Sequence, residues 1–330
     1  MKLATFAHDG TTSAGVIAEN RIHAIPGVTV LSLVERGLPA ALEAGEQAIR
    51  TSEPLALGEV KLLPPLSPPS MRDFVAFEEH VEGVVRAING TDIVVPEWYD
   101  APTFYFTNPH TLLGHGDPVE FPSASNVRDF ELEVAVVVSG AGRSLSVEQA
   151  RNHVFGYTIL NDWSARDLQR REMKVLLGPA KGKDFANSLG PCLVTADELE
   201  RFRDDAGFLD LWCSAEVNGV EVGNDLLSNM GWTFESMIAY ASRDAAVDSG
   251  DVLGSGTTGH GGCLAELWGR RGEQDPPPLQ EGDVVTLTVE GIGSLTNVVA
   301  TASPAPELPA VRRRSAADTR AQHLAQRATP

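Results

Sequence analysis

Glu131 and Glu133 form the pattern in this chain that most directly predicts chemistry. They lie two residues apart in the segment FELEVAVVV (130–138), which is rich in the β-branched residues typical of a buried strand. Residues i and i+2 of a strand face the same side, so the two carboxylates point together. Two adjacent buried carboxylates repel each other unless a cation lies between them. The pair therefore predicts a cation site, with a solvated strand face as the alternative.

Two aspartates are further candidates for the same cation. Asp162 follows the apolar run of GYTILND and precedes a polar helical segment, although an aspartate before a helix often serves only as an N-cap. Asp73 stands directly after the proline-rich stretch LLPPLSPPS (62–70). A cluster of carboxylates selects a hard divalent cation. We expect Mg²⁺, with Mn²⁺ or Ca²⁺ as alternatives.

The elements that must position these residues are mostly strands between residues 71 and 302. Five segments have the composition and the flanking turn residues of strands: 130–140, 153–162, 211–222, 251–257 and 283–299. Helical spacing of apolar residues occurs in 147–153, 164–173 and 224–244. Because strands and helices do not alternate regularly, the sequence predicts an α+β, mainly β fold and argues against a Rossmann or TIM-barrel arrangement.

Composition shifts along the chain predict three parts. Residues 1–65 alternate short strand-like runs with turns and then become helical over 29–50, which indicates a small N-terminal α/β domain. The proline-rich stretch marks its boundary, and residues 66–306 form the expected catalytic domain. Residues 307–330 carry five arginines and two acidic residues without any aromatic side chain. We expect this tail to be disordered or only weakly helical.

Charge and cysteine content exclude several classes of protein. The 45 acidic and 26 basic residues give a net charge of −19, which would repel nucleic acid and anionic membranes. The sequence has no apolar run of about 18 residues and no signal-peptide pattern at its start. The three cysteines are far apart, which argues against a disulfide framework. We therefore expect a soluble protein of the cytoplasm.

The order of several motifs resembles one known family. FELEVAVVV, GYTILNDWSARDLQ, LGPAKGKDF, GSGT and CLAELWG follow one another as they do in the fumarylacetoacetate hydrolase family, over roughly residues 71–302. Glu-x-Glu alone is a weak signal, whereas NDWSARDxQ followed by LGPxxGKxF is specific. The resemblance implies the family's β-roll core and a divalent metal ion, with Asp73, Glu131, Glu133 and Asp162 as its ligands.

The resemblance also implies roles for residues that have simpler explanations when taken singly. It makes His80, seven residues after Asp73, the catalytic base, with Glu266 orienting it and Lys183 beside the metal. Without the family pattern, His80 would be a surface residue of an acidic helix, Lys183 a solvated side chain in a glycine loop, and Glu266 a partner of Arg270. The residues implied to bind substrate are Arg166, Gln169, Tyr105 and Thr257.

The implied activity is a metal-dependent hydrolysis of a C–C bond in a β-diketo or acylpyruvate-type acid, a reaction type of aromatic catabolism. The alternative is a decarboxylase, isomerase or tautomerase acting on the same metal-bound enolate, for example on oxaloacetate. A catalytically silent scaffold protein is a third reading. Val75 stands where fumarylacetoacetase has a tyrosine, so we do not expect fumarylacetoacetate itself as substrate. The expected partners are a small keto acid and a second copy in a homodimer.

Overall fold

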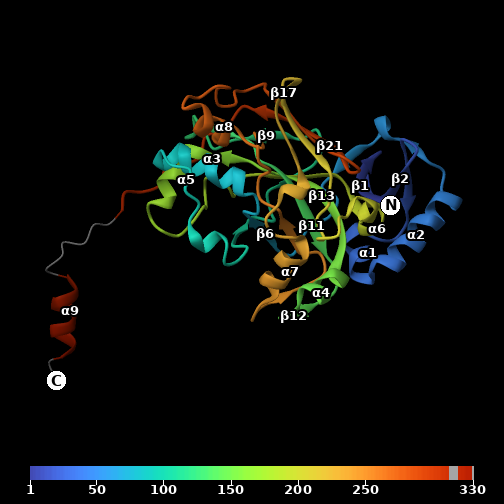
Figure 1. The fold of residues 1–330 in the computed structure, drawn as a ribbon, viewed down its shortest axis with the longest axis horizontal. Helices are drawn as coiled ribbons and strands as arrows, with labels where there is room; N and C mark the ends of the chain where they lie inside the picture. Colours follow the sequence, from blue (N-terminus) through green and yellow to red (C-terminus); the bar gives the residue numbers. More distant parts are fainter. Residues whose placement is uncertain (312–318, 329–330) are drawn as a thin grey trace.

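A mixed sheet of twelve strands forms the centre of the protein in the computed structural model, which describes residues 1–311 and 319–328 (Figure 1). The strands of its main path are, in spatial order, β4 (Leu55–Ala56), β3 (Arg21–Ile25), β2 (Thr11–Ala18), β1 (Lys2–His8), β15 (Asn187–Thr195), β13 (Val154–Asp162), β11 (Leu132–Val138), β19 (Val252–Gly254), β6 (Met71–Phe74) and β7 (Phe104–Thr107). Two more strands pair beside this path, β5 (Lys61–Leu63) with β1 and β8 (Leu112–Leu113) with β15.

The middle strands of this sheet are buried on both faces. Every residue of β11 and β13 is buried. Along β11, Leu132, Val134 and Val136 pack into one apolar cluster, while Ala135 and Val137 pack into another on the opposite face. This explains why the segment is an almost continuous apolar run, as expected for strands covered on both sides.

A second sheet of five strands covers one face of the first. Its spatial order is β17 (Val220–Leu226), β16 (Trp212–Val217), β20 (Val284–Val289), β21 (Gly293–Ala300) and β9 (Pro118–Glu120). Side chains such as Cys213 and Leu287 of this sheet share an apolar cluster with Leu132 and Val134 of β11. Two short ribbons complete the strands: β10 (Arg128–Asp129) with β14 (Ser164–Ala165), and β12 (Gly142–Arg143) with β18 (Ala246–Val247).

Most of the helices lie around the sheets (Figure 1). Helices α1 (Val30–Arg36) and α2 (Leu38–Thr51) cover the N-terminal strands, α3 (Glu78–Asn89) packs on α8 (Leu264–Arg271), and α4 (Val147–Ala150) packs on α7 (Phe234–Ser242). The others are α5 (Arg166–Met173), α6 (Ala196–Leu199) and α9 (Thr319–Arg327), with 3₁₀ turns at Leu57–Glu59, Pro96–Trp98, Arg151–His153, Glu200–Phe202 and Leu227–Asn229. In the part of the chain that the structure describes, no helix has the length and apolar character needed to cross a membrane.

The α+β, mainly β prediction is confirmed, with two corrections in detail. The helix expected over 224–244 begins only at Phe234, because residues 224–226 pair with β16 as the end of β17. Strand β15 was not predicted, because its Gly190-Pro191 step is unusual inside a central strand. The N-terminal strands extend the main sheet through the β1–β15 pair. Residues 312–318 and 329–330 of the expected tail lie outside the described residues, and Thr319–Arg327 form α9. The three domain limits stay predictions.

Candidate active site

Four carboxylates from adjacent strands meet below the surface. Asp73 lies on β6, Glu131 directly precedes β11, Glu133 lies on β11 and Asp162 ends β13. One oxygen of each lies within 4.8 Å of the others, and none of the four residues is more than 4% exposed. Gly254 of β19 leaves them room, because a Cβ there would lie 2.5 Å from Glu133 Oε2 and 3.2 Å from Asp73 Oδ1. The solvated alternative for the Glu-x-Glu pair is therefore wrong.

These carboxylates have unmet bonding capacity. Among the described residues, Asp73 Oδ1, Glu133 Oε1 and Asp162 Oδ1 are buried without a hydrogen-bond partner. Burial raises the pKa of all three groups, because a charged carboxylate loses its hydration there. Native proteins rarely leave such atoms unpaired. An all-oxygen set of this kind fits a hard divalent cation such as Mg²⁺ or Mn²⁺.

Two cationic side chains contact the carboxylates. The Lys183 ammonium donates to Glu131 Oε2 and to Asp162 Oδ2, and Arg166 Nη2 lies 2.7 Å from Glu131 Oε1. Burial alone would raise the pKa of Glu131, but the charges of Lys183 and Arg166 hold it well below its usual range. Lys183 is only 3% exposed, so it is not a solvated loop side chain. The cluster thus already contains positive charge.

Asp129 is a residue that sequence reasoning missed. Its carboxylate is fully buried and accepts hydrogen bonds from Arg166 Nε at 2.8 Å and from the backbone N–H groups of Leu264 at 2.8 Å and Ala265 at 3.0 Å. It therefore joins Arg166, which contacts Glu131, to the first turn of α8. Its position two residues before Glu131 was the available signal, although the structure places Asp129 on β10 and Glu131 just before β11.

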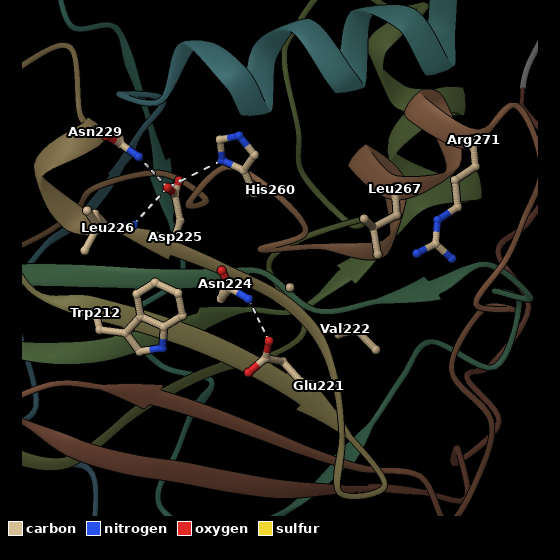
Figure 2. A pocket seen from close by; sticks show the side chains of 11 residues that line it. Trp212, Glu221, Val222, Asn224, Asp225, Leu226, Asn229, His260, Leu267 and Arg271 are labelled. Atoms are coloured by element: carbon tan, nitrogen blue, oxygen red, sulfur yellow. Dashed lines mark hydrogen bonds and ion pairs between the residues drawn. The ribbon is translucent and has the colours of Figure 1, made fainter.

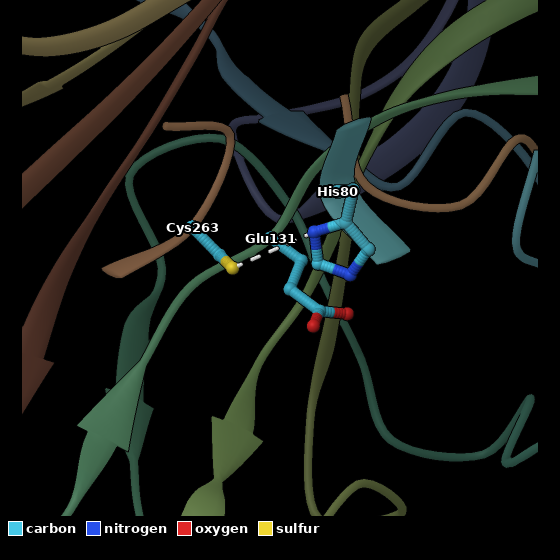
Figure 3. A group of neighbouring side chains, drawn as sticks. All are labelled: His80, Glu131 and Cys263. Atoms are coloured by element: carbon cyan, nitrogen blue, oxygen red, sulfur yellow. Dashed lines mark hydrogen bonds between the residues drawn. The ribbon is translucent and has the colours of Figure 1, made fainter. Parts of the chain in front are cut away.

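The expected base lies on the other side of Glu131. His80 of α3 is 7% exposed, and its Nδ1 lies 3.8 Å from Glu266 Oε2 and 3.8 Å from Cys263 Sγ. The first distance is that of an ion pair and is too long for a hydrogen bond. Figure 3 shows His80, Cys263 and Glu131 converging, and their donor atoms lie within 4.8 Å of one another. The surface alternative for His80 is therefore wrong.

Glu266 contacts both residues that the sequence analysis offered as its partners, His80 and Arg270. Its Oε1 accepts from Arg270 Nε at 2.8 Å, while its Oε2 faces His80. Burial would raise the pKa of Glu266, but His80 and Arg270 together lower it, so the carboxylate stays charged. A charged carboxylate at this place can orient an imidazole and stabilise its protonated form.

Two glycines allow α3 and α8 to approach each other closely. A Cβ on Gly83 would lie 2.3 Å from Glu266 Cγ, and a Cβ on Gly269 would lie 2.0 Å from the Gly83 carbonyl oxygen. Both distances are shorter than van der Waals contact. His80 and Glu266 can therefore lie side by side because Gly83 and Gly269 carry no side chain at this crossing.

The four residues expected to bind substrate lie at or beside the carboxylates. Tyr105 donates its hydroxyl to Asp162 Oδ2 at 2.7 Å, and Gln169 Oε1 accepts from Arg166 Nη1 at 3.2 Å. Thr257 is buried and follows Gly256, whose N–H donates to Glu133 Oε2 at 3.2 Å. The segment GSGTTG (254–259) has GxGxxG spacing, but it leaves β19 as a loop and α8 begins only at Leu264. Substrate contacts for these residues stay predictions.

A separate hollow of about 540 Å³ lies beside β17 and α8. Figure 2 shows Asp225 at its upper edge, with His260 Nδ1 3.4 Å from Asp225 Oδ1, and Trp212 and Glu221 below. The sequence had not indicated this place. None of the four clustered carboxylates lines it, so it is not the predicted cation site.

Comparison with known families covers almost the whole chain. A family model described as "Fumarylacetoacetate (FAA) hydrolase C-terminal" matches residues 70–300, and one described as "Rv2993c-like, N-terminal" matches residues 1–65. The chain is 29% identical to "Oxaloacetate tautomerase YisK" of Bacillus subtilis over 84% of its own length and 88% of that protein. It is 26% identical to a fumarylacetoacetase of Dictyostelium discoideum, over 71% of this chain and 68% of that protein.

A solved structure shares the fold. The fumarylacetoacetate hydrolase of Exiguobacterium antarcticum superposes with a TM-score of 0.73 at 27% identity, covering 91% of this chain and 99% of the other. The expected core of this fold type, joined to a small N-terminal α/β part, is therefore confirmed.

Proposed function

Because this chain belongs to the fumarylacetoacetate hydrolase family, we propose that it is a metal-dependent hydrolase that cleaves a C–C bond in a β-diketo or acylpyruvate-type acid. One observation carries this proposal. The His80–Glu266 pair lies beside four buried carboxylates, three of which have an unpaired oxygen. A base next to a cation site is what the addition of water to a chelated carbonyl compound requires.

Asp73, Glu131, Glu133 and Asp162 would hold the ion, for which Mg²⁺ is our first choice and Mn²⁺ or Ca²⁺ the alternatives. When bound, a divalent ion would polarise the two oxygens of a 1,3-dicarbonyl acid. The unpaired oxygens support direct contact of Asp73, Glu133 and Asp162 with the ion. Glu131 differs from these three because both of its oxygens already have a cationic partner, Arg166 at Oε1 and Lys183 at Oε2.

His80 Nδ1 faces Glu266 and Cys263, so Nε2 is the nitrogen that takes a proton from water. The water oxygen then bonds to a carbonyl carbon of the substrate, the adjacent C–C bond breaks, and its electron pair leaves as an enolate. Glu266 stabilises the imidazolium during this step. Lys183 and Arg166 supply positive charge where the enolate oxygen develops negative charge. The imidazolium returns its proton to the enolate carbon, which completes the reaction.

A second candidate is keto–enol tautomerisation of oxaloacetate. It is favoured by one relative, since "Oxaloacetate tautomerase YisK" matches this chain over most of both lengths. The same base would then move a proton between the carbon next to the ketone and the enol oxygen, without attack by water. The two reactions use the same residues and differ in their products.

The test is an assay of several acylpyruvates and of oxaloacetate with Mg²⁺, following both enol absorbance and products. Hydrolysis yields two acids, and this is the expected result. Loss of enol without a new product would indicate the tautomerase, and carbon dioxide without a second acid would indicate a decarboxylase. Either outcome would overturn the hydrolase proposal.

The His80→Ala variant tests the assigned base. Loss of a positioned base typically lowers turnover by about 10²–10⁴-fold. Mn²⁺ binding, measured by titration calorimetry, should stay unchanged because the four carboxylates remain. His8→Ala, on the N-terminal strand β1, is the matched control and should keep full turnover. Normal turnover of the His80 variant would remove this residue from the mechanism.

The homodimer and the cytoplasmic location stay predictions. Light scattering of the purified protein tests the first, since a single chain has a mass of 35.2 kDa.

A further inference from the structure

We propose that His80, Cys263 and Glu131 form a second cation site, which takes a thiophilic divalent ion such as Zn²⁺. The four carboxylates offer oxygen atoms alone, whereas these three residues offer a ring nitrogen, a thiol sulfur and a carboxylate oxygen (Figure 3). Nitrogen and sulfur donors favour zinc over magnesium or calcium. The two sites share Glu131 and therefore lie side by side.

The distances between these donor atoms are close to those between ligand atoms that bind the same zinc ion. His80 Nδ1 and Cys263 Sγ are 3.8 Å apart. Zinc bonds of about 2.0–2.1 Å to nitrogen and 2.3 Å to sulfur, at a tetrahedral angle, place these two atoms roughly 3.6 Å apart. One ring nitrogen of His80, Cys263 Sγ and one Glu131 carboxylate oxygen lie within 4.8 Å of one another. Glu266 Oε2, at 3.8 Å from the same His80 nitrogen, is the available fourth ligand.

The local charge favours a second cation. Six buried carboxylates face three cationic side chains here, so one divalent ion at the four carboxylates leaves the region still negative. A second ion would displace one of the two cations from Glu131, and Cys263 would release its proton on binding. The carboxylates are Asp73, Asp129, Glu131, Glu133, Asp162 and Glu266, and the cations are Arg166, Lys183 and Arg270.

Occupation of this site would block the base. An ion on His80 Nδ1 would leave the ring proton on Nε2, so Nε2 would have no lone pair with which to take a proton from water. Zinc would then inhibit an enzyme that Mg²⁺ supports. This consequence rests on the proposed function, whereas binding of the ion does not.

Cobalt(II) provides the direct test, because a thiolate bound to Co²⁺ gives a charge-transfer absorption band that oxygen ligands do not give. The full chain is loaded with Mg²⁺ and titrated with Co²⁺, and then with Zn²⁺ as competitor. We expect one thiolate band that saturates at one ion per chain and disappears when Zn²⁺ is added.

Cys263→Ser is the informative variant, and it should fold. Cys263 is the N-cap of α8 and accepts from the Glu266 N–H at 3.4 Å, and serine is a preferred N-cap residue. The variant should lose the band, and its affinity for Zn²⁺ should fall by at least about 100-fold, since even the loss of an indirect contact costs 10–100-fold. Cys192→Ser, at a buried cysteine on β15, is the matched control and should keep the band.

Absence of a thiolate band in the unmodified protein, or its persistence in Cys263→Ser, would overturn the proposed site. Turnover adds a separate test: Zn²⁺ should inhibit the unmodified enzyme and should inhibit Cys263→Ser at least about 100-fold less strongly. Equal inhibition of both would show that zinc acts at the four carboxylates, and the blocking role would be wrong. If no keto acid is turned over, the proposed function fails while the spectrum still decides the zinc site.

Discussion

The carboxylates and the base of the candidate site are held in different ways. Asp73, Glu133 and Asp162 lie on strands of the main sheet, where β13 pairs with β11, β11 with β19 and β19 with β6. His80 and Glu266 instead lie on α3 and α8, which contact each other at glycines. Backbone hydrogen bonds therefore position the strand group, which consists of Asp73, Glu133 and Asp162. Side-chain packing positions the helix group, which consists of His80 and Glu266. Cation affinity and turnover should therefore be separable by mutation.

Asp129 and Glu131 connect the two groups. Asp129 holds Arg166 and also the first N–H groups of α8, and Glu131 lies within 4.8 Å of His80 as well as of the other carboxylates. Changes at these residues should affect cation binding and turnover together.

The largest effect is expected from Glu133→Gln in the strand group. The amide keeps the shape but removes the charge, so Mn²⁺ should bind at least about 100-fold more weakly and turnover should fall with it. The unfolding temperature of the metal-free protein should not decrease, because burial raises the pKa of Glu133 and disfavours its charged form. Calorimetry and unfolding curves measure the two effects.

Glu235→Gln is the control for this change. Glu235 is also a buried carboxylate, but it pairs with Arg203 at 2.9 Å and is not among the clustered residues. It should leave Mn²⁺ binding unchanged. Normal Mn²⁺ binding in Glu133→Gln would remove Glu133 from the set of ligands.

Asp129→Asn should lower both Mn²⁺ affinity and turnover by about 10- to 100-fold, which is the usual cost of removing an indirect contact of a metal ligand. The amide cannot accept from Arg166 and from both backbone N–H groups at once, so Arg166 and α8 both lose a fixed position. Calorimetry with Mn²⁺ and the keto-acid assay test this together. If only turnover changes, Asp129 acts through α8 alone, and the link to Glu131 is wrong.

Gly83→Ala should have the smallest effect, limited to the helix group. Alanine is favoured over glycine in a helix by about 1 kcal/mol, so propensity alone would stabilise α3. Its Cβ, however, would lie 2.3 Å from Glu266 Cγ and would push Glu266 away from His80. Turnover should fall roughly 10-fold, because misplacement by about 1 Å can cost up to 10²-fold, and Mn²⁺ binding should stay normal.

Gly58→Ala is the matched control, because a Cβ at Gly58 has no heavy atom within 4 Å among the described residues. It should not change turnover. Weaker Mn²⁺ binding in Gly83→Ala would mean that the two groups are not separable at all.

The strand group could be predicted from the sequence to a large extent. The period of two along FELEVAVVV placed Glu131 and Glu133 together, and the end of a neighbouring strand indicated Asp162. The same period could have indicated Asp129. Strand β15 could not be predicted, because its Gly-Pro step contradicts strand preferences and only pairing with β1 and β13 stabilises it.

The proximity of His80 and Glu266 could not be predicted from local sequence patterns. His80 and Glu266 are 186 residues apart, and nothing in either helix indicates that the other is near. Their proposed roles came from the family resemblance, and their proximity comes from the packing of α3 on α8. Cys263 had no signal of its own, since a single buried cysteine is common in protein cores.

The mainly β fold, and which carboxylates share a strand face, follow from the order of residues, because alternation of side chains is a local property of the backbone. Three contacts follow instead from the packing of distant segments: Asp73 against Glu133, Asp129 between Arg166 and α8, and Cys263 at 3.8 Å from His80. These contacts join segments far apart in the chain, and they depend on strand order and on glycines at helix crossings. Such contacts arise when the elements pack, and therefore leave no periodic pattern in any one segment.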